Sequence, residues 1–465
     1  MIESGVSLLR LALGLGAVFF LGYAALAILL PHPREFTPTE RAACSFGVGA
    51  TVLTLWMLAL TWRGLLFSLW LILGPPLVLA IVILLTPRGR AALTQDFSSW
   101  RPRFSPNLRS WDWLFLGLLG AVLAFALLRA MLYPMWAWDA IATWGCKARI
   151  FYVTRGVDLT CIDAHNYYPN LLPLLLSYLY FCLGQVNDYL VSGVFPLWGG
   201  LLLGLLYSLS LRLGLSRRQA LGLTAFLVLN GTVFIVHLYI AYADLPLAFF
   251  ALGAAGLLYL WLSDTAPRGS LALTAALLAG MAWCKYEGPP LAATLLLAAT
   301  LTLAWLRPAG WRRRLGLLLI PAAGLLAGYL PWRLFSMQHD LVIGADHIQS
   351  FYPQQFTAGV SYLLAGLAQP YYFGVLWPAL LLACIFSGPR LWRSPRLFLA
   401  LFLGGNLLAI ILAYAVAPTS PAEFPSYVRA TLDRLLLHIT PVAALLLGLG
   451  LREAAGSGVR PGDNS

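Results

Sequence analysis

The sequence predicts an all-α polytopic membrane protein, and three observations lead to this fold class. First, 60% of the 465 residues are hydrophobic and only 10% are charged, whereas a soluble domain needs a charged surface. Second, apolar stretches follow one another from end to end, and a helix needs about 20 apolar residues to cross a bilayer. Third, the alternating pattern of membrane β-strands is missing, and helices satisfy their own backbone hydrogen bonds in lipid.

We expect about 13 transmembrane helices, arranged in three regions of the chain. Residues 1–112 supply three spans and an arginine-rich cytoplasmic loop, residues 113–452 form the main membrane domain, and residues 453–465 form a disordered, polar tail. The expected spans lie near 6–31, 43–61, 64–86, 113–133, 190–211, 219–238, 245–262, 271–284, 289–306, 315–335, 358–386, 397–416 and 434–451. The first run is too long for a cleavable signal and lacks a small-residue cleavage site, so we count it as a span.

The loops between these spans alternate in composition, and this alternation orients the chain. One set is rich in arginine, and the other holds aromatic, histidine and acidic residues. The positive-inside rule places the arginine-rich set in the cytoplasm. Its members are Arg34, Arg41, Arg88, Arg90, Arg101, Arg103, Arg109, Arg212, Arg217, Arg218, Arg268, Arg307, Arg312, Arg313, Arg314, Arg390, Arg393, Arg396, Arg452 and Arg460. Orientation in a membrane therefore explains the net charge of +12, and we expect no nucleic-acid partner.

One apolar run, 171–186, does not fit the alternation. Asp139 is expected outside and Arg217 inside, which allows one crossing between them, yet both 171–186 and 190–211 are apolar. We infer that 171–186 lies in the membrane interface or re-enters the membrane. The alternative interpretation places Arg217 and Arg218 outside and contradicts the positive-inside rule.

The first large outward segment is rich in tryptophan, which is typical of the headgroup level of a bilayer. It contains Asp139, Lys147 and Arg149. If the segment is helical, Asp139 and Lys147 lie about 13 Å apart on a similar face and could address two ends of one reacting centre. The alternative is an interfacial helix with a solvated acid. Cys146 and Cys161 share the segment and could form a disulfide or stay as thiols.

Two further clusters stand between apolar runs on the outward side. Asp244 lies where an acid near hydrocarbon costs on the order of 2.5–3.5 kcal/mol, so it is a functional candidate unless it forms a hairpin tip in water. Lys285 and Glu287 form the second cluster, close enough in sequence to pair. Lys147 and Lys285 are the only lysines among the 30 basic residues, and a compact ammonium suits a phosphate oxygen.

Three arginines, Arg333, Arg429 and Arg434, also fall in or beside outward loops, where each could be an ordinary loop charge. The histidines on this side lack the spacing of a helix-borne metal site. Cofactor use stays open, and a divalent metal is conceivable near the acids.

The order of these motifs resembles that of the GT-C glycosyltransferase superfamily over roughly residues 113–450. The resemblance rests on an early outward aspartate (Asp139), a His-x-x-Tyr-Pro step (His165, Tyr168, Pro169), a second acid before Pro (Asp244), a Lys-x-Glu-Gly step (Lys285 to Gly288) and a late Arg-x-x-x-His-x-x-Pro pattern (Arg434, His438, Pro441). Two features depart from the family: three spans precede the first loop, and a soluble C-terminal domain is absent.

The resemblance implies an inverting transfer of a sugar from a polyprenyl-phosphate carrier to a glycan, lipid or protein acceptor, on the extracytoplasmic side of a bacterial inner membrane. Asp139 would be the general base, and Asp244 and Glu287 would position the acceptor or a metal. The donor phosphate would be bound by Lys147, Arg149, Lys285, Arg333, Arg429 and Arg434, and His165, Tyr168 and Pro169 would close the loop. The alternative is a transporter or flippase of a lipid-linked glycan, which would favour internal repeats and mid-membrane binding groups.

Overall fold

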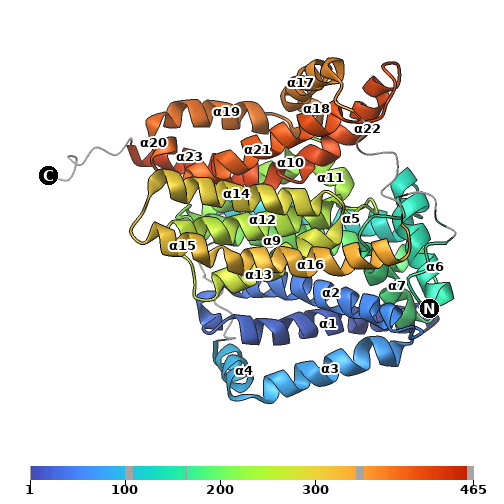
Figure 1. Ribbon diagram of the computed structural model, residues 1–465. Helices are drawn as coiled ribbons and strands as arrows, with labels where there is room; N and C mark the ends of the chain where they lie inside the picture. Colours follow the sequence, from blue (N-terminus) through green and yellow to red (C-terminus); the bar gives the residue numbers. More distant parts are fainter. Residues whose placement is uncertain (1, 100–107, 161, 163–164, 342–349, 458–465) are drawn as a thin grey trace.

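A computed structural model describes residues 2–99, 108–160, 162, 165–341 and 350–457, and none of these residues forms a strand (Figure 1). The N-terminal region holds α1 (Ile2–Leu29), η1 (Pro33–Glu35), α2 (Pro38–Trp62), α3 (Leu69–Leu85) and α4 (Pro87–Ser99). The middle of the chain holds α5 (Ser110–Leu132), the π-helical segment η2 (Ala140–Gly145), α6 (Cys146–Thr154), α7 (Leu171–Leu183), α8 (Asp188–Val191), α9 (Val194–Arg212), α10 (Arg217–Leu229), α11 (Val233–His237) and α12 (Asp244–Leu262).

The last third holds α13 (Ser270–Cys284), α14 (Gly288–Leu306), α15 (Trp311–Leu317), α16 (Leu319–Gln338), α17 (Pro353–Ala368), α18 (Pro370–Phe373), α19 (Leu376–Ser387), α20 (Pro389–Trp392), α21 (Arg396–Ala415), α22 (Phe424–Leu437) and α23 (Thr440–Ser457). α23 therefore extends past residue 453, where we predicted that a disordered tail begins. Residues 458–465 lie outside the described part.

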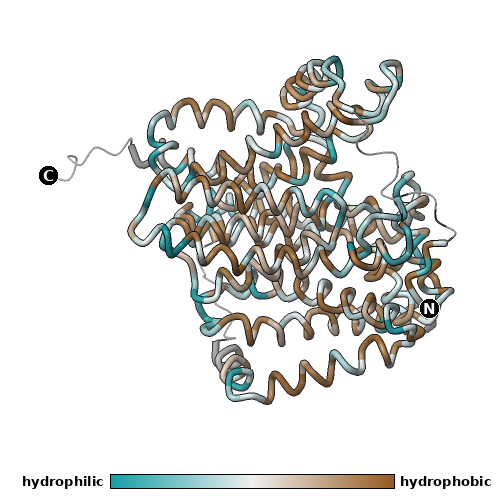
Figure 2. Tube along the Cα trace, viewed as in Figure 1, coloured by the Kyte–Doolittle hydropathy of each residue, from teal (hydrophilic) through white to brown (hydrophobic). Residues whose placement is uncertain are grey.

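The helices are long and apolar enough to confirm a polytopic membrane protein. Within the described residues, eight helices could each cross a membrane, and up to ten if each of two bent helix pairs forms one span, against the 13 predicted. Figure 2 shows hydrophobic residues along the lengths of the helices and hydrophilic residues gathered near their ends. The difference in number arises because several apolar runs are interrupted or short.

Two of the predicted spans contain breaks that face each other. The run 219–238 stops at Asn230 and Gly231, and the run 358–386 turns at Gly374, both glycines having positive φ angles. The Asn230 side chain donates a hydrogen bond to the carbonyl of Phe373 and accepts one from the backbone N–H of Val375 at 3.1 Å. Each break thus satisfies backbone groups of the other, which a membrane protein requires at an interruption.

The ambiguous run 171–186 forms α7, which is short and buried. Thirteen helical residues span about 20 Å, less than the roughly 30 Å of a bilayer's hydrocarbon core. α7 packs against α1, α2 and α6, and Gly184 ends it in the left-handed conformation. The continuous helical stretch Asp188–Arg212 follows it and is long enough to cross. These lengths favour the interpretation in which 171–186 does not cross.

Contacts between distant arginine-rich loops place these loops together at one end of the bundle. Arg212 pairs with Glu40, and the backbone N–H of Arg268 donates to Glu35 at 2.6 Å. Arg452 donates to the carbonyl of Leu213. The loops that the alternation assigns to the other set gather at the opposite end, around α6 and α7 (Figure 1).

Close helix contacts hold the centre of the bundle together. α12 is buried on nearly all faces. α13 and α16 approach closely because Gly324 and Gly328 lie against the backbone of Ala275 and Ala279, where a Cβ would overlap a carbonyl. Asp244 begins α12 and Lys285 follows α13, so these tightly packed helices position two of the predicted site residues.

Candidate functional site

A buried carboxylate, Asp244, is the centre of a charge network at the end of the bundle opposite the arginine-rich loops. Its side chain is fully buried. Oδ1 accepts hydrogen bonds from Lys285 Nζ and His438 Nε2, each at 2.8 Å. Oδ2 lies 3.3 Å from both Nε and Nη2 of Arg434. Two cations and an imidazole therefore hold this acid as a carboxylate.

Asp139 joins the same network through Arg434. The guanidinium Nη2 lies 2.6 Å from Oδ2 of Asp139, so one arginine bridges two carboxylates that are far apart in the sequence. The ring of Tyr242 lies 4.5 Å below the guanidinium carbon. Asp139 keeps 15% of its side chain exposed, whereas Asp244 keeps none, so of these two acids only Asp139 is open to a bound molecule.

Glu287 extends the network through Lys285, whose Nζ lies 3.0 Å from Oε1. Burial disfavours the charged form of Glu287, but Lys285 and His438 together outweigh this effect and lower the pKa of Glu287. The second oxygen, Oε2, is buried without a hydrogen-bond partner among the described residues. Glu287 therefore has one oxygen left to accept a hydrogen bond from a bound molecule.

The predicted loop-closing motif packs against the same cluster as an aromatic wall. The ring of Tyr168 stacks on Tyr286 with centroids 5.8 Å apart and on His165 at 4.7 Å. Trp332 donates to the carbonyl of Tyr167 at 2.8 Å, which fastens the loop to α16. Burial, with Glu287 adding to it, raises the pKa of Tyr168 well above its ordinary value. Pro169 follows at the turn into α7, so the whole motif lies beside Lys285 and Glu287.

Lys147 lies outside the charge network, contrary to the helical geometry that we expected from the sequence. It is fully buried, and its Nζ donates to the carbonyl of His165 at 2.6 Å. The segment between Asp139 and Lys147 is π-helical, which changes the phase of the side chains and turns Lys147 toward the loop rather than toward Arg434. Burial lowers the pKa of Lys147 from 10.5 to about 7.

The remaining predicted cations are spread over different places. Arg149 forms an ion pair with Asp188, which also accepts a hydrogen bond from Tyr180 at 2.5 Å. Arg429 is exposed and donates to Ser426 at 3.2 Å. Arg333 lies on α16, where its charge acts on Tyr286. Of the six cations predicted to bind phosphate, the structure brings Lys285 and Arg434 to the acids.

Sequence reasoning assigned no role to two residues of the network, His438 and Tyr242. The signal for His438 was its position four residues after Arg434, which places both side chains on one face of α22 and its C-cap. The signal for Tyr242 was its position two residues before Asp244. Cys161, the proposed partner of Cys146, lies outside the described residues.

The arrangement does not fit a divalent metal. Within the described ranges, no group of three or more His, Cys, Asp or Glu side chains could hold an ion. Lys285 and Arg434 already contact both oxygens of Asp244 and one oxygen each of Asp139 and Glu287. The site instead offers fixed cations beside an accessible carboxylate, a combination that suits a proton transfer coupled to the departure of an anion.

Comparison with known proteins finds the same fold in a solved membrane protein. No family model and no curated protein matches the chain. The chain resembles ArnT from Cupriavidus metallidurans bound to undecaprenyl phosphate, with a TM-score of 0.51 and 15% identity over 75% of this chain and 62% of the ArnT chain. It resembles ArnT in the apo state equally, with a TM-score of 0.51 and 17% identity over 75% of this chain and 61% of the other.

This likeness shows that the chain has the fold of ArnT, in agreement with the fold that the resemblance led us to expect. The chain spans about three-fifths of the length of the ArnT chains that it matches.

Proposed function

We propose that the protein is an inverting glycosyltransferase that moves a sugar from a polyprenyl-phosphate carrier to an acceptor hydroxyl, at the extracytoplasmic face of a bacterial inner membrane. The observation that carries the proposal is the meeting of Asp139 and Asp244 on one guanidinium, that of Arg434, inside a GT-C-type fold. The undecaprenyl phosphate bound to the structural neighbour supports a prenyl-phosphate donor.

In this proposal Asp139 is the general base. Its carboxylate takes the proton of the acceptor hydroxyl as that oxygen forms a bond to the anomeric carbon of the donor sugar. The bond between that carbon and the phosphate oxygen breaks on the opposite face, and its electron pair leaves with the prenyl phosphate. A positioned base of this kind typically contributes 10²–10⁴-fold in rate.

Arg434 controls when Asp139 can act. Before donor binds, a guanidinium nitrogen 2.6 Å away holds the Asp139 carboxylate in an ion pair. An arriving phosphate competes for the same guanidinium, so donor binding frees Asp139 at the moment when a base is needed. Lys285 supplies a second cation toward the leaving group, while Asp244, fully buried, holds both cations in place.

Apolar hollows on the bilayer side suit the carrier chain. A cavity of about 400 Å³ lies between α10, α19 and α23 and is lined by Leu223, Phe226 and Leu447 among others. A neighbouring hollow between α5 and α10 shares Phe226 and extends to Asn230. The two hollows lie along α10, from the arginine-rich end near Leu215 and Leu451 to Asn230, where the helix stops.

Transfer from a labelled donor tests the proposal. The purified protein, in proteoliposomes with polyprenyl-phosphate sugars and candidate acceptors, should release polyprenyl phosphate with and without a chelator. Asp139→Asn should lose at least about 100-fold in kcat. Asp158→Asn is the matched control, because Asp158 belongs to the same outward segment and, among the described residues, its carboxylate accepts hydrogen bonds from nearby Thr160.

Near-normal transfer by a folded Asp139→Asn protein would remove Asp139 from the base role. Movement of intact donor across the bilayer without release of prenyl phosphate would favour the transporter alternative. The charged groups lie at one end of the bundle rather than at mid-length, which favours the enzyme.

A further inference from the structure

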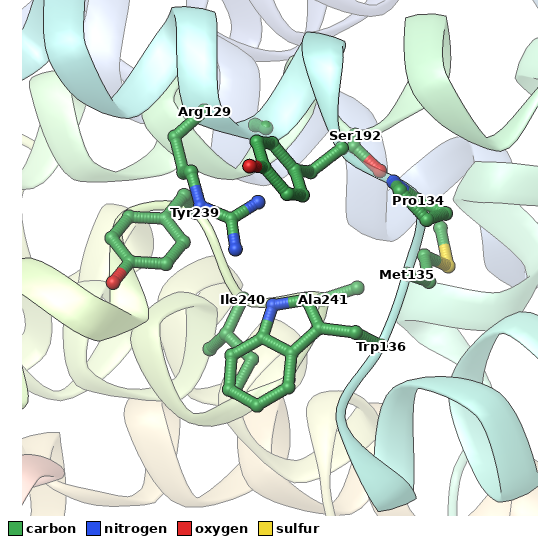
Figure 3. A pocket seen from close by; sticks show the side chains of 10 residues that line it. Arg129, Pro134, Met135, Trp136, Ser192, Tyr239, Ile240 and Ala241 are labelled. Carbon is green, nitrogen blue, oxygen red and sulfur yellow. The ribbon is translucent and has the colours of Figure 1, made fainter.

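A second recess lies beside the acids, around Arg129 near the end of α5. Its lining includes Tyr133, Trp136, Ser192 and Tyr239. In Figure 3 the guanidinium of Arg129 points into the recess, between the rings of Tyr239 and Trp136. The recess is therefore a small polar hollow with a cation at its centre and aromatic side chains around it.

Arg129 is a cation without an acidic partner. Across the described ranges, no carboxylate lies within ion-pair distance of it. Its guanidinium carbon lies 3.5 Å from the centroid of the Tyr133 ring and 5.5 Å from that of Tyr239. Stacking fixes the plane of the guanidinium and leaves its N–H groups free to donate, which is the geometry that recognises a phosphate.

The surroundings of the recess indicate a ligand that comes from the bilayer. α5 is a 23-residue apolar helix with few buried residues, and Tyr133 and Trp136 are both more than half exposed. Exposed tyrosine and tryptophan at the end of a span are typical of the headgroup level. The apolar hollow lined by Phe115 lies on the same helix, about 21 Å from Arg129 at the helical rise per residue. A lipid could therefore place its chain along α5 and its phosphate at Arg129.

We propose that the Arg129 recess binds the phosphate group of a membrane lipid. The recess is separate from the charge network, yet its walls include residues three and four positions before each acid, Met135–Trp136 before Asp139 and Ile240–Ala241 before Asp244. A lipid phosphate held there would lie next to the catalytic groups. The proposal concerns binding and does not depend on the transfer reaction.

Two lipids carry the required chemistry, an anionic phospholipid and a prenyl phosphate. Native mass spectrometry of the full-length protein, titrated separately with phosphatidylglycerol, phosphatidylcholine and undecaprenyl phosphate, distinguishes them. Arg129→Gln should weaken the first binding event for at least one anionic lipid by about tenfold, as expected for the loss of charge-assisted hydrogen bonds. A loss confined to undecaprenyl phosphate would identify a prenyl phosphate as the ligand, and a loss for both lipids would identify any anionic headgroup.

Arg218→Gln is the matched control. Arg218 also stacks on an aromatic ring of α5, that of Trp111 at 5.1 Å, but at the opposite end of the helix. The Arg218→Gln protein should bind all three lipids with the affinity of the wild type. If Arg129→Gln does not fold, Arg129→Lys replaces it. This variant keeps the charge but loses the planar guanidinium, so its affinity for the anionic lipid should fall by about threefold. Equal binding by the wild type and the folded Arg129 variants, or an equal loss in Arg218→Gln, would overturn the proposal.

Discussion

Replacing Asp244 by Asn, Lys285 by Met, and both together tests the ion pair at the centre of the charge network. At their 2.8 Å separation, two unit charges attract by about 6 kcal/mol with an effective dielectric constant near 20, and desolvation offsets part of this. Removing one partner of a buried pair costs about 3–5 kcal/mol. Lys285 keeps its ion pair with Glu287, and Arg434 keeps its ion pair with Asp139. We therefore expect each single variant to lower the free energy of unfolding by about 3 kcal/mol.

The double variant leaves fewer uncompensated charges, so it should cost about 4 kcal/mol, which gives a coupling free energy near 2 kcal/mol. The free energy of unfolding in mixed detergent micelles, followed by circular dichroism during a titration with dodecyl sulfate, measures each variant. A control cycle of Asp158→Asn with Lys285→Met should be additive. Additivity within about 0.5 kcal/mol for Asp244 and Lys285 would refute the assignment of this contact as a buried ion pair.

Three further substitutions probe other features. Gly328→Leu would push α16 away from the Ala279 carbonyl on α13 and should lower the free energy of unfolding by about 1–3 kcal/mol, together with transfer activity. Asn230→Leu would leave backbone groups at the break near Gly374 unsatisfied, so it should cost about 2–4 kcal/mol and speed hydrogen exchange there. Lys147→Met should raise the free energy of unfolding at pH 7. The difference from the wild type should shrink by up to about 1.4 kcal/mol per pH unit toward pH 10.

The sign for Lys147 follows from its lowered pKa. Between about pH 7 and 10.5 the unfolded lysine binds a proton that the folded one does not, so the stability of the wild type rises with pH in this window. A pH-independent difference in the free energy of unfolding between wild type and Lys147→Met would contradict this.

Gly316→Leu is the control for Gly328→Leu, because a Cβ at Gly316 meets open space. Unchanged hydrogen exchange at the Val375 amide, which donates to the Asn230 side chain, would show in Asn230→Leu that the two breaks do not depend on each other.

Hydropathy predicted most of the helices because burial in lipid is a local property of the sequence. The spans at 43–61, 245–262 and 397–416 correspond to α2, α12 and α21. Hydropathy failed at Asn230–Gly231 and at Gly374 because apolar residues flank both breaks. The Asn-Gly pair is a turn signal, but its effect depends on a hydrogen-bond partner more than 140 residues away.

The site was predictable in its location and less so in its contacts. Asp139, Asp244, Lys285 and Glu287 meet because each follows or precedes a span at the same end of the bundle. The expectation that Asp139 and Lys147 share one face of a regular α-helix did not allow for the π-helical segment between them, which changes the side-chain phase. The pairing of Arg434 with both acids needed the bend between α22 and α23, which no periodicity shows.

The two sides of the charge network are anchored to very different supports. Asp244 begins α12, a helix enclosed by its neighbours, whereas Arg434 and His438 lie at a 51° bend between α22 and α23. A change of that bend would withdraw the guanidinium and the imidazole together while the acids stayed still. Under the proposed function, such a change at this one joint would expose the carboxylate of Asp139.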